Sequence, residues 1–217
     1  MSGRVIYTLL SVLVFALFSF AQDTTPAVKK ANERPAEKVR VDAEPFDNAD
    51  IKTMASKCVS LDTEVGLIEI ELFPESAPES VRNFLNLTAT GLFDTTTFSR
   101  VVPGFVIQGG SLWTRIGALT SAQATRARRA LQDEPNKILH ERGIVSMARG
   151  DEPNTAKTSF FILVTRSEHL DGMFAAFGRV TIGMEVVDAI NKAQVTDEKP
   201  QKPVRVKKAN VQSCTAN

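Results

Sequence analysis

The sequence is poor in the residues that build metal and redox sites. It contains only two cysteines and two histidines. Cys58 and Cys214 lie far apart, so there is no Cys-x-x-Cys pair, and His140 and His169 stand outside any metal-ligand spacing. We therefore expect neither a metal centre nor a cofactor.

An excess of charge of either sign is also absent. The formal net charge is +1, with 43% hydrophobic and 24% charged residues, the balance of an ordinary globular protein. The composition gives no electrostatic argument for binding to nucleic acid or to an anionic surface. It indicates no activity by itself.

A long apolar run stands at the N-terminus. Residues 1–4 carry a single positive charge, and the stretch from Val5 to Ala21 carries none. Ser19 and Ala21 occupy the small-residue positions that signal peptidase prefers. These features predict a signal peptide at residues 1–21, cleavage after Ala21, and export to the periplasm or out of the cell. An uncleaved membrane anchor is the alternative, although the run is short for a bilayer span.

Residues 22–55 differ in composition from the rest of the chain. They are rich in Ala, Pro, Lys and Glu and lack sustained hydrophobic periodicity. Such a composition is typical of a solvated, flexible linker. We expect a single folded domain at residues 56–217.

Export gives the two cysteines a structural role to consider. Cys58 stands near the start of the predicted domain and Cys214 near its end. In an oxidising compartment they can form a disulfide if the terminal strands are neighbours. Closing so long a loop would remove about 4–5 kcal/mol of unfolded-state entropy in the chain-entropy model. Two free thiols are the alternative.

The domain is predicted to be mainly β. The segment LIEIEL alternates apolar and acidic residues, so one face is buried while Glu69 and Glu71 face water. Turn residues separate the strand-like runs, which suggests a closed antiparallel barrel of eight strands because closure removes exposed edges. The runs lie at residues 58–63, 67–73, 96–102, 105–108, 143–147, 159–164, 176–180 and 204–211.

Two segments have helical rather than strand periodicity. Pro78 to Ala89 begins with proline and an acidic residue and is followed by a glycine, which are start and stop signals of a helix. Gly183 to Lys192 carries a second apolar helical stripe. We expect each helix to cap one open end of the barrel.

One apolar segment contains a charge in its middle. From Phe98 to Gly110 it reads FSRVVPGFVIQGG, and later blocks read RGIVSMAR, SFFILV and HLDGMFAAFGRVTIGMEVVDAI. In this order the blocks resemble the cyclophilin family over about residues 58–211. The resemblance implies a closed eight-stranded barrel capped by two helices and peptidyl-prolyl cis-trans isomerase activity.

The chemistry of that reaction explains the arginine in the first block. Rotation about an Xaa-Pro bond faces a barrier of about 20 kcal/mol because the amide loses its conjugation. The twisted prolyl nitrogen regains a lone pair, so a donor that meets it binds the transition state more strongly than the planar ground states. Arg100 is suited to this role because its guanidinium is always charged and offers several donors. No nucleophile or metal is needed.

The resemblance also implies a substrate groove around Arg100. Strand alternation supports part of it, since Ser159 and Phe161 share a face while Phe160 points the other way. Gln108 is expected to orient Arg100. The implied proline pocket consists of Phe105, Val106, Phe161 and Leu170, and Ala148 and Arg149 match the stretch whose backbone binds the extended peptide.

Five positions depart from common family patterns. Ser99 replaces a frequent histidine, Ser111 an acidic residue, and Ser159 a glutamine that faces the substrate. His169 and Phe174 also differ from residues found in other members at these substrate-facing positions. We expect activity, reduced in rate, with weak or no cyclosporin binding.

Residues 112–141 fit the family least. They contain a basic stretch at Arg126, Arg128 and Arg129 and the single tryptophan, Trp113. A partner-binding patch is one interpretation, and a solvated helix face beside the groove is the favoured one. Trp113 either contacts substrate at the groove rim or anchors this segment to the barrel.

The sequence thus predicts a monomeric prolyl isomerase that assists protein folding outside the cytoplasm. Its partners would be proline-containing peptides and unfolded or exported proteins, not nucleic acid, with membrane contact only through an uncleaved signal. One alternative is a catalytically weak proline-peptide binding or chaperone module on the same fold. Another is a small-ligand barrel of the lipocalin type, which a barrel interior filled by side chains would exclude.

Overall fold

The computed structural model describes residues 43–214. The predicted signal peptide at residues 1–21 and most of the predicted linker lie outside this range. Among the described residues, no helix is both long and apolar enough to cross a bilayer.

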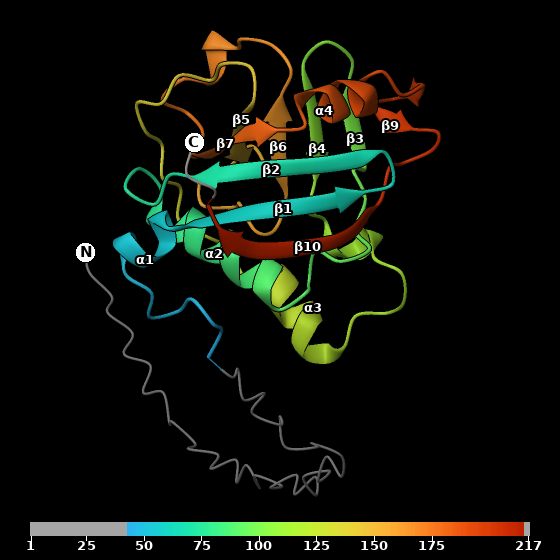
Figure 1. Cartoon of the computed structure of the whole chain (residues 1–217). Coiled ribbons are helices and arrows are strands. Elements are labelled where there is room, and N and C mark those ends of the chain that lie inside the picture. Colours follow the sequence, from blue (N-terminus) through green and yellow to red (C-terminus); the bar gives the residue numbers. More distant parts are fainter. Residues whose placement is uncertain (1–42, 215–217) are drawn as a thin grey trace, which may run out of the picture. The chain divides into compact units, whose positions relative to one another are not determined.

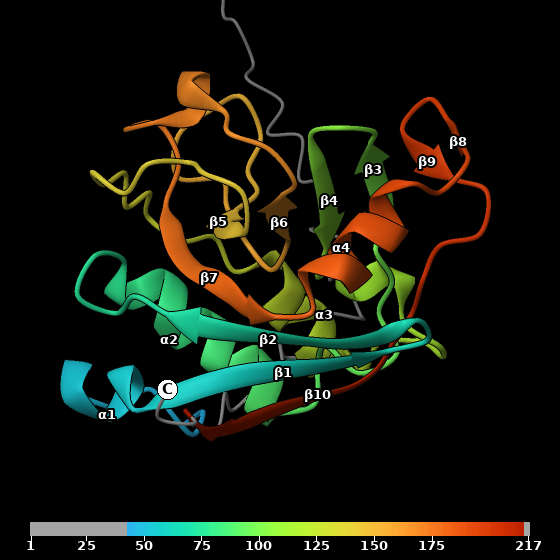
Figure 2. The same ribbon diagram turned by 45° about the horizontal axis from the view of Figure 1, so that its top comes forward.

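A curled antiparallel sheet of eight strands forms the body of the domain (Figures 1 and 2). Its strand order is β10-β1-β2-β7-β5-β6-β4-β3, and each of the predicted strands is part of it. The strands are β1 (Lys57–Thr63), β2 (Gly66–Leu72), β3 (Arg100–Val102), β4 (Val106–Gly109), β5 (Ile144–Met147), β6 (Phe160–Leu163), β7 (Ala176–Ile182) and β10 (Val206–Ser213). A separate hairpin consists of β8 (Val195–Thr196) and β9 (Lys199–Pro200).

The prediction of a barrel closed by a continuous ladder is wrong. β3 and β10 are the two edges of the sheet, and β3 has only three residues although the sequence favoured a strand over residues 96–102. Thr95 has a φ of 62°, a left-handed conformation that interrupts an extended chain before β3. An isolated bridge between Thr97 and Arg205 joins the two edges instead. The sheet therefore curls into an incompletely closed barrel.

Within residues 43–214, four α-helices accompany the sheet: the two predicted caps, one in the basic segment where a helix face was favoured, and one that the sequence did not indicate. α2 (Pro78–Ala89) has the predicted bounds, and α4 (Met184–Asn191) lies within the predicted range. The additional helices are α1 (Ile51–Ala55) and α3 (Ser121–Arg128), and single 3₁₀ turns occur at η1 (Leu112–Thr114) and η2 (Glu168–Leu170).

The N-terminus of α2 is capped from a distant part of the chain. Its N-cap residue, Ala77, has no side chain able to accept a hydrogen bond. Glu134 replaces that cap: its Oε1 accepts from the amide of Glu79 at 2.9 Å and its Oε2 from the amide of Ser80 at 2.8 Å. A carboxylate at a helix N-terminus is stabilising because the first amides lack helical partners. The atypical segment 112–141 is thus an integral part of the domain.

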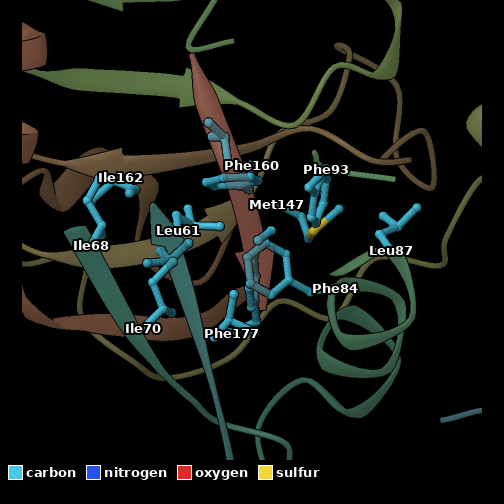
Figure 3. Packing of buried hydrophobic residues seen from close by; sticks show 14 of the residues in the cluster. Leu61, Ile68, Ile70, Phe84, Leu87, Phe93, Met147, Phe160, Ile162 and Phe177 are labelled. Carbon is cyan, nitrogen blue, oxygen red and sulfur yellow. The ribbon is translucent and has the colours of Figure 1, made fainter. Parts of the chain in front are cut away.

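Side chains fill the interior of the barrel (Figure 3). Phe84 of α2 packs with Phe93, Phe160 and Phe177, at ring-centroid distances of 5.2, 5.2 and 5.0 Å. Aliphatic residues of β1 and β2, such as Leu61, are fully buried in the same cluster. A filled interior leaves no room for a ligand, which excludes the lipocalin-type alternative.

Residues 43–55, assigned from the sequence to the end of the linker, lie against the domain. Arg82 of α2 donates to the carbonyl oxygens of Phe46 and Ala49 at 2.7 and 2.8 Å, and Asn86 Oδ1 accepts from the amide of Phe46 at 2.7 Å. Met54 is fully buried. The folded domain therefore begins before residue 56. The charged side chains of residues 43–55 take part as well, since Glu44 pairs with Arg126 and Asp47 Oδ1 accepts from Asn86 Nδ2. The sequence did not indicate the bounds of this docked segment because it lacks hydrophobic periodicity.

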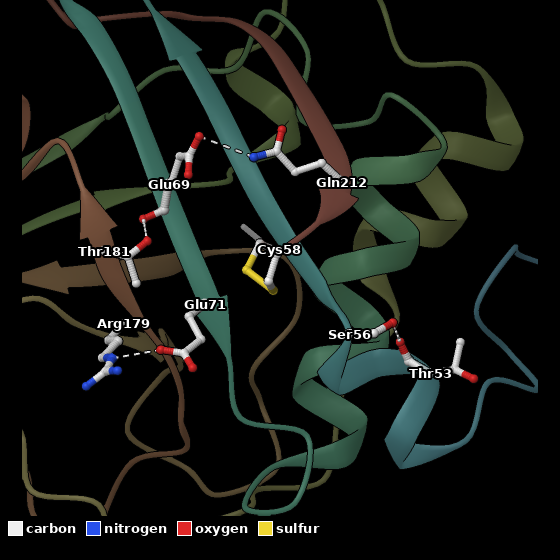
Figure 4. The surroundings of a disulfide bond; sticks show 9 residues. Thr53, Ser56, Cys58, Glu69, Glu71, Arg179, Thr181 and Gln212 are labelled. Carbon is white, nitrogen blue, oxygen red and sulfur yellow. Dashed lines mark hydrogen bonds and ion pairs between the residues drawn. A yellow bond between two sulfur atoms is a disulfide. The ribbon is translucent and has the colours of Figure 1, made fainter. Parts of the chain in front are cut away.

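A disulfide joins Cys58 and Cys214 (Figure 4). Their Cα atoms are 4.9 Å apart, because β1 and β10 are neighbouring antiparallel strands. The bridge ties the C-terminal end of the described chain to the start of the sheet, next to α1 (Figure 4).

Candidate functional site

The β3–β4 hairpin supplies one wall of the candidate site. Arg100 lies opposite Gln108 in the β3–β4 ladder, and Gln108 lies opposite Phe161 in the β4–β6 ladder. Residues paired across antiparallel strands have their side chains on the same face of the sheet. The three side chains therefore form one row across β3, β4 and β6.

A pocket of about 230 Å³ opens beside this row. It brings together all the predicted site residues except Ser159. The lining residues are Arg100, Phe105, Val106, Gln108, Ala148, Arg149, Phe161, His169, Leu170 and Phe174.

The floor of the pocket is apolar and rigidly packed. Val106, Phe161 and Leu170 are buried and belong to a hydrophobic cluster separate from the main core. Phe174 meets Phe161 edge to face, with ring centroids 5.7 Å apart. Phe160, the neighbour of Phe161 on β6, lies in the main core as the alternation predicted. An apolar floor of this kind suits a small apolar ring.

Arg100 stands at the polar rim and is half-exposed. Its Nη1 donates to Gln108 Oε1 over a long 3.4 Å, which agrees with the expected pairing. Its closest contact was not foreseen: Nε donates to Glu198 Oε2 at 2.7 Å. Glu198 lies in the turn between β8 and β9, outside every block that carried the family resemblance, so no sequence pattern pointed to it.

Asn191, at the end of α4, is a second residue that sequence reasoning missed. Its side chain is buried and holds the turn between β3 and β4. The Nδ2 group donates to the carbonyls of Val102 and Val106 at 2.9 and 3.0 Å, and Oδ1 accepts from the amide of Gly104 at 2.8 Å. Gly104 has a φ of 74°, so the turn also needs a residue that tolerates this conformation.

Arg149 contributes a fixed side chain as well as backbone. Its guanidinium lies over the Phe174 ring, 4.8 Å from the centroid, and forms an ion pair with Asp133 at 3.2 Å. Behind it lies an adjoining pocket of about 190 Å³. Ser159 lines this adjoining pocket, which shares Gln108, Ala148 and Arg149 with the first one. The lining residues are Gln108, Ala148, Arg149, Gly150, Thr155, Lys157 and Ser159.

A buried polar network lies next to the floor, around His140. Its Nε2 is 3.0 Å from Ser146 Oγ and its Nδ1 is 3.2 Å from Asp171 Oδ1, while its ring stacks on Phe161 at 6.4 Å. Arg166 completes the network with a 2.6 Å hydrogen bond to Asp171. This Ser-His-Asp order resembles a nucleophilic triad, but the Ser146 and His140 side chains are fully buried and no substrate reaches them.

Burial and pairing set the protonation states in this network. Burial lowers the pKa of His140, which favours the neutral ring. The hydrogen bond from Arg166, with that from the His140 amide, lowers the pKa of Asp171 to about 2. The network is therefore a neutral imidazole held by an ionised carboxylate, and it supports the ring of Phe161 from behind.

The basic stretch of residues 112–141 lies away from the pocket lining. Arg126 is buried in an ion pair with Glu44 at 2.7 Å, and Arg128 lies over the Trp113 ring at 5.2 Å. Trp113 is exposed and is not among the residues that line either pocket. Burial of Arg126 departs from a fully solvated helix face, and neither of the two interpretations of Trp113 is supported by these contacts.

Within residues 43–214, no group of three or more His, Cys, Asp or Glu side chains is arranged to hold a metal ion. The pocket thus offers an apolar floor, the guanidinium groups of Arg100 and Arg149, and the amide of Gln108. This arrangement suits recognition of a small apolar ring flanked by peptide groups.

Comparison with known proteins identifies the family. The profile of the family described as "Cyclophilin type peptidyl-prolyl cis-trans isomerase/CLD" matches residues 58–211. The chain belongs to the cyclophilin family.

Relatives of this cyclophilin carry the same activity in their names. Peptidyl-prolyl cis-trans isomerase CYP18-1 of Arabidopsis thaliana is 35% identical over 155 residues, 70% of this chain and 94% of the relative. Peptidyl-prolyl cis-trans isomerase A of Dickeya dadantii is 36% identical over 161 residues, 71% of this chain and 82% of the relative. The cyclophilin is accordingly a peptidyl-prolyl cis-trans isomerase, as the sequence predicted.

A solved structure gives the same fold. The cyclophilin-type isomerase of Cryptosporidium parvum, crystallised in the presence of the dipeptide Ala-Pro, superposes with a TM-score of 0.63 and 28% identity. The match covers 72% of this chain and 99% of the other. The mainly β architecture with a curled antiparallel sheet is therefore that of the family.

Proposed function

We propose that this cyclophilin rotates Xaa-Pro bonds in the pocket beside β3 and β4, with Arg100 as the catalytic residue. The observation that carries the proposal is the position of Arg100 at the rim of a preformed apolar pocket. Nε donates to Glu198 and one Nη1 hydrogen to Gln108, so among the contacts of the described residues the second Nη1 hydrogen and both Nη2 hydrogens are left for a ligand.

The geometry separates two tasks that the reaction requires. The floor formed by Val106, Phe161 and Leu170 binds the proline ring equally in cis and trans, which holds the substrate without lowering the barrier. The guanidinium meets the prolyl nitrogen only when the twisted amide has restored its lone pair, so this contact is stronger in the transition state. Rate enhancement is thus assigned to the rim and ground-state binding to the floor.

The proposed substrates are proline-containing segments of unfolded or exported proteins, bound by a monomer outside the cytoplasm. The Ala-Pro dipeptide used with the Cryptosporidium parvum relative supports binding of proline peptides. The apolar run from Val5 to Ala21 supports export through a cleaved signal. The Cys58–Cys214 disulfide supports an oxidising compartment.

A binding module with weak catalysis is the second candidate. One observation favours it: Arg100 already forms an ion pair with Glu198, which neutralises part of the charge that a catalytic donor needs. A pure binder would hold proline peptides on the same floor but would not need the guanidinium for rate.

An isomerisation assay on Ala-Pro peptides, comparing the parent with Arg100→Ala, separates the two candidates. We expect the parent to accelerate isomerisation and the variant to lose about 10²–10³-fold in kcat/KM, the range found when one transition-state donor is removed. Peptide affinity should change much less, because the floor remains. Circular dichroism and thermal unfolding check that the variant is folded. An equally active Arg100→Ala variant would refute the role of Arg100, and a folded but inactive parent that still binds peptide would leave the binding module as the function.

A further inference from the structure

The turn between β8 and β9 has an unfavourable residue at a left-handed position. The pairs Val195–Pro200 and Thr196–Lys199 leave Asp197 and Glu198 as a two-residue loop. Both loop residues have positive φ, 50° and 62°. Two-residue hairpins of this kind favour Asn-Gly or Asp-Gly, because glycine adopts such φ values without steric cost. Here Glu198 stands where glycine would be least strained.

The backbone and the side chain of Glu198 both attach the turn to β3. Its carbonyl oxygen accepts a hydrogen bond from the amide of Val101 at 2.8 Å. Its carboxylate accepts one from Arg100 Nε at 2.7 Å. Backbone and side chain of one residue therefore fix the position of two consecutive residues of β3.

We propose that Glu198 is a positioning residue for Arg100, an inference that rests on the proposed function. Arginine has a long, flexible side chain, and its catalytic value depends on holding the planar guanidinium in one orientation. Glu198 holds the Nε edge and Gln108 the Nη1 edge, so the plane is defined by two contacts. These two contacts thereby also fix the orientation of the Nη2 group.

Backbone strain strengthens the assignment. A non-glycine residue held in the left-handed region persists where its surroundings impose it, and such residues cluster at functional sites. The hairpin itself would be more stable with glycine at position 198, so the carboxylate serves something other than the turn. Its contact with Arg100 is the hydrogen bond that the side chain makes in the described structure.

The molecule contains a matched ion pair that serves as a control. Arg179 Nε donates to Glu71 Oε2 at 2.8 Å, compared with 2.7 Å for Arg100 and Glu198, and both pairs are largely exposed. Glu71 and Arg179 lie opposite one another on β2 and β7, near the disulfide and outside both pockets (Figure 4). Loss of such an exposed pair is expected to have little effect on stability.

Three substitutions of Glu198 separate positioning from turn stability. Glu198→Ala keeps the strained backbone and removes the carboxylate, whereas Glu198→Gly removes both the carboxylate and the strain. We expect both to lower kcat/KM on Ala-Pro peptides by about tenfold, the order expected for one charge-assisted hydrogen bond. Glu198→Gln keeps an acceptor and should retain at least about a third of the parental activity. Glu71→Ala should be as active as the parent.

In Glu198→Gly, activity should fall while stability is kept or rises. The melting temperature of Glu198→Gly is expected to equal or exceed that of the parent, because glycine relieves the left-handed strain. If Glu198 were needed only for the turn, the enzyme would lose activity in Glu198→Ala and regain it in Glu198→Gly. Peptide Kd should stay within about twofold throughout, because the effect lies in the placement of a transition-state donor.

A spectroscopic measurement decides the proposal without relying on turnover. The Nε–H resonance of Arg100, assigned by its absence in Arg100→Lys, should show the downfield shift and slow exchange of a hydrogen-bonded group in the parent. We expect both properties to be lost in Glu198→Ala and Glu198→Gly and kept in Glu71→Ala.

The outcomes distinguish failure of the two proposals. If Arg100→Ala is as active as the parent, the role of Arg100 fails while the resonance still reports whether Glu198 holds it. If Glu198→Ala and Glu198→Gly match or exceed parental kcat/KM, or the Arg100 resonance is unaltered in them, the positioning role of Glu198 is overturned.

Discussion

The floor and the rim of the pocket are built in different ways. The floor consists of apolar side chains on adjacent strands, such as Val106 and Phe161, which are buried and backed by a second hydrophobic cluster. The rim is a half-exposed arginine held by a remote turn, and its hairpin is fastened by Asn191 of α4. Packing determines the floor, whereas individual hydrogen bonds from the C-terminal part of the chain determine the rim.

Because of this difference, substitutions in the floor and at the rim should affect different properties of the protein. Changes in the floor remove buried area and should reduce stability and peptide affinity together. Changes at the rim remove polar contacts and should reduce catalysis with less effect on folding. The substitutions of Arg100 and Glu198 described above test the rim alone.

The largest effect on stability is expected for Phe161→Ala, which tests the floor. Removing a buried phenylalanine leaves a cavity and should cost about 3–5 kcal/mol in unfolding free energy. Peptide affinity should fall as well, because the ring forms part of the proline pocket. Denaturant unfolding and peptide titration measure the two losses, with Phe161→Leu as the milder control. A fully stable Phe161→Ala variant would show that the floor is not the rigid element described above.

Asn191→Ala tests the connection between floor and rim. The variant leaves the amide of Gly104 and the carbonyls of Val102 and Val106 without their side-chain partner. We expect a loss of about 1–3 kcal/mol in unfolding free energy, the usual cost of unsatisfied buried groups, and a reduced kcat/KM. The exposed neighbour Lys192→Ala is the matched control. If Asn191→Ala lowers stability but leaves kcat/KM unchanged, the hairpin keeps its shape without this fastening.

The smallest effect concerns pH and the network behind the floor. Burial lowers the pKa of His140, so the unfolded chain binds a proton that the folded domain resists. Stability should therefore fall as the pH drops below about 6.5, by at most about 1.4 kcal/mol per pH unit for one proton. The pKa of Asp171 is lowered to about 2, so its contribution is present above about 4 and is lost as the pH falls towards 2.

Urea unfolding at pH 7, 5 and 3 measures this dependence. His140→Gln should flatten the decline between pH 7 and 5, because it removes the buried imidazole whose pKa is lowered. An unchanged decline in His140→Gln would place the titrating group elsewhere.

Much of the fold was predictable because its signals are local. Strand-like runs separated by turn residues identified the strands that carry Arg100, Gln108 and Phe161, and the start and stop residues of α2 predicted its bounds. The predicted pocket residues come together because antiparallel pairing brings β4 and β6 side by side. Ser159 lines the adjoining pocket, which shares Gln108, Ala148 and Arg149 with the first one.

Other features had no local signal. The docked segment around Phe46 lacks periodicity, and Glu134 looks like any charged loop residue although it caps α2. The sequence also did not show that β3 would begin only at Arg100, because nothing in the run of threonines before it indicates that Thr95 adopts a left-handed conformation.

The sequence by itself determined the family, the order of the strands along the chain and the apolar floor, since these depend on periodicity and on motifs within short segments. Only the tertiary structure decided that Glu198 and Asn191 hold the rim. The physical reason is separation along the sequence. Each residue makes hydrogen bonds to residues more than 80 positions away, and the local sequence around a single polar side chain does not indicate such a partner.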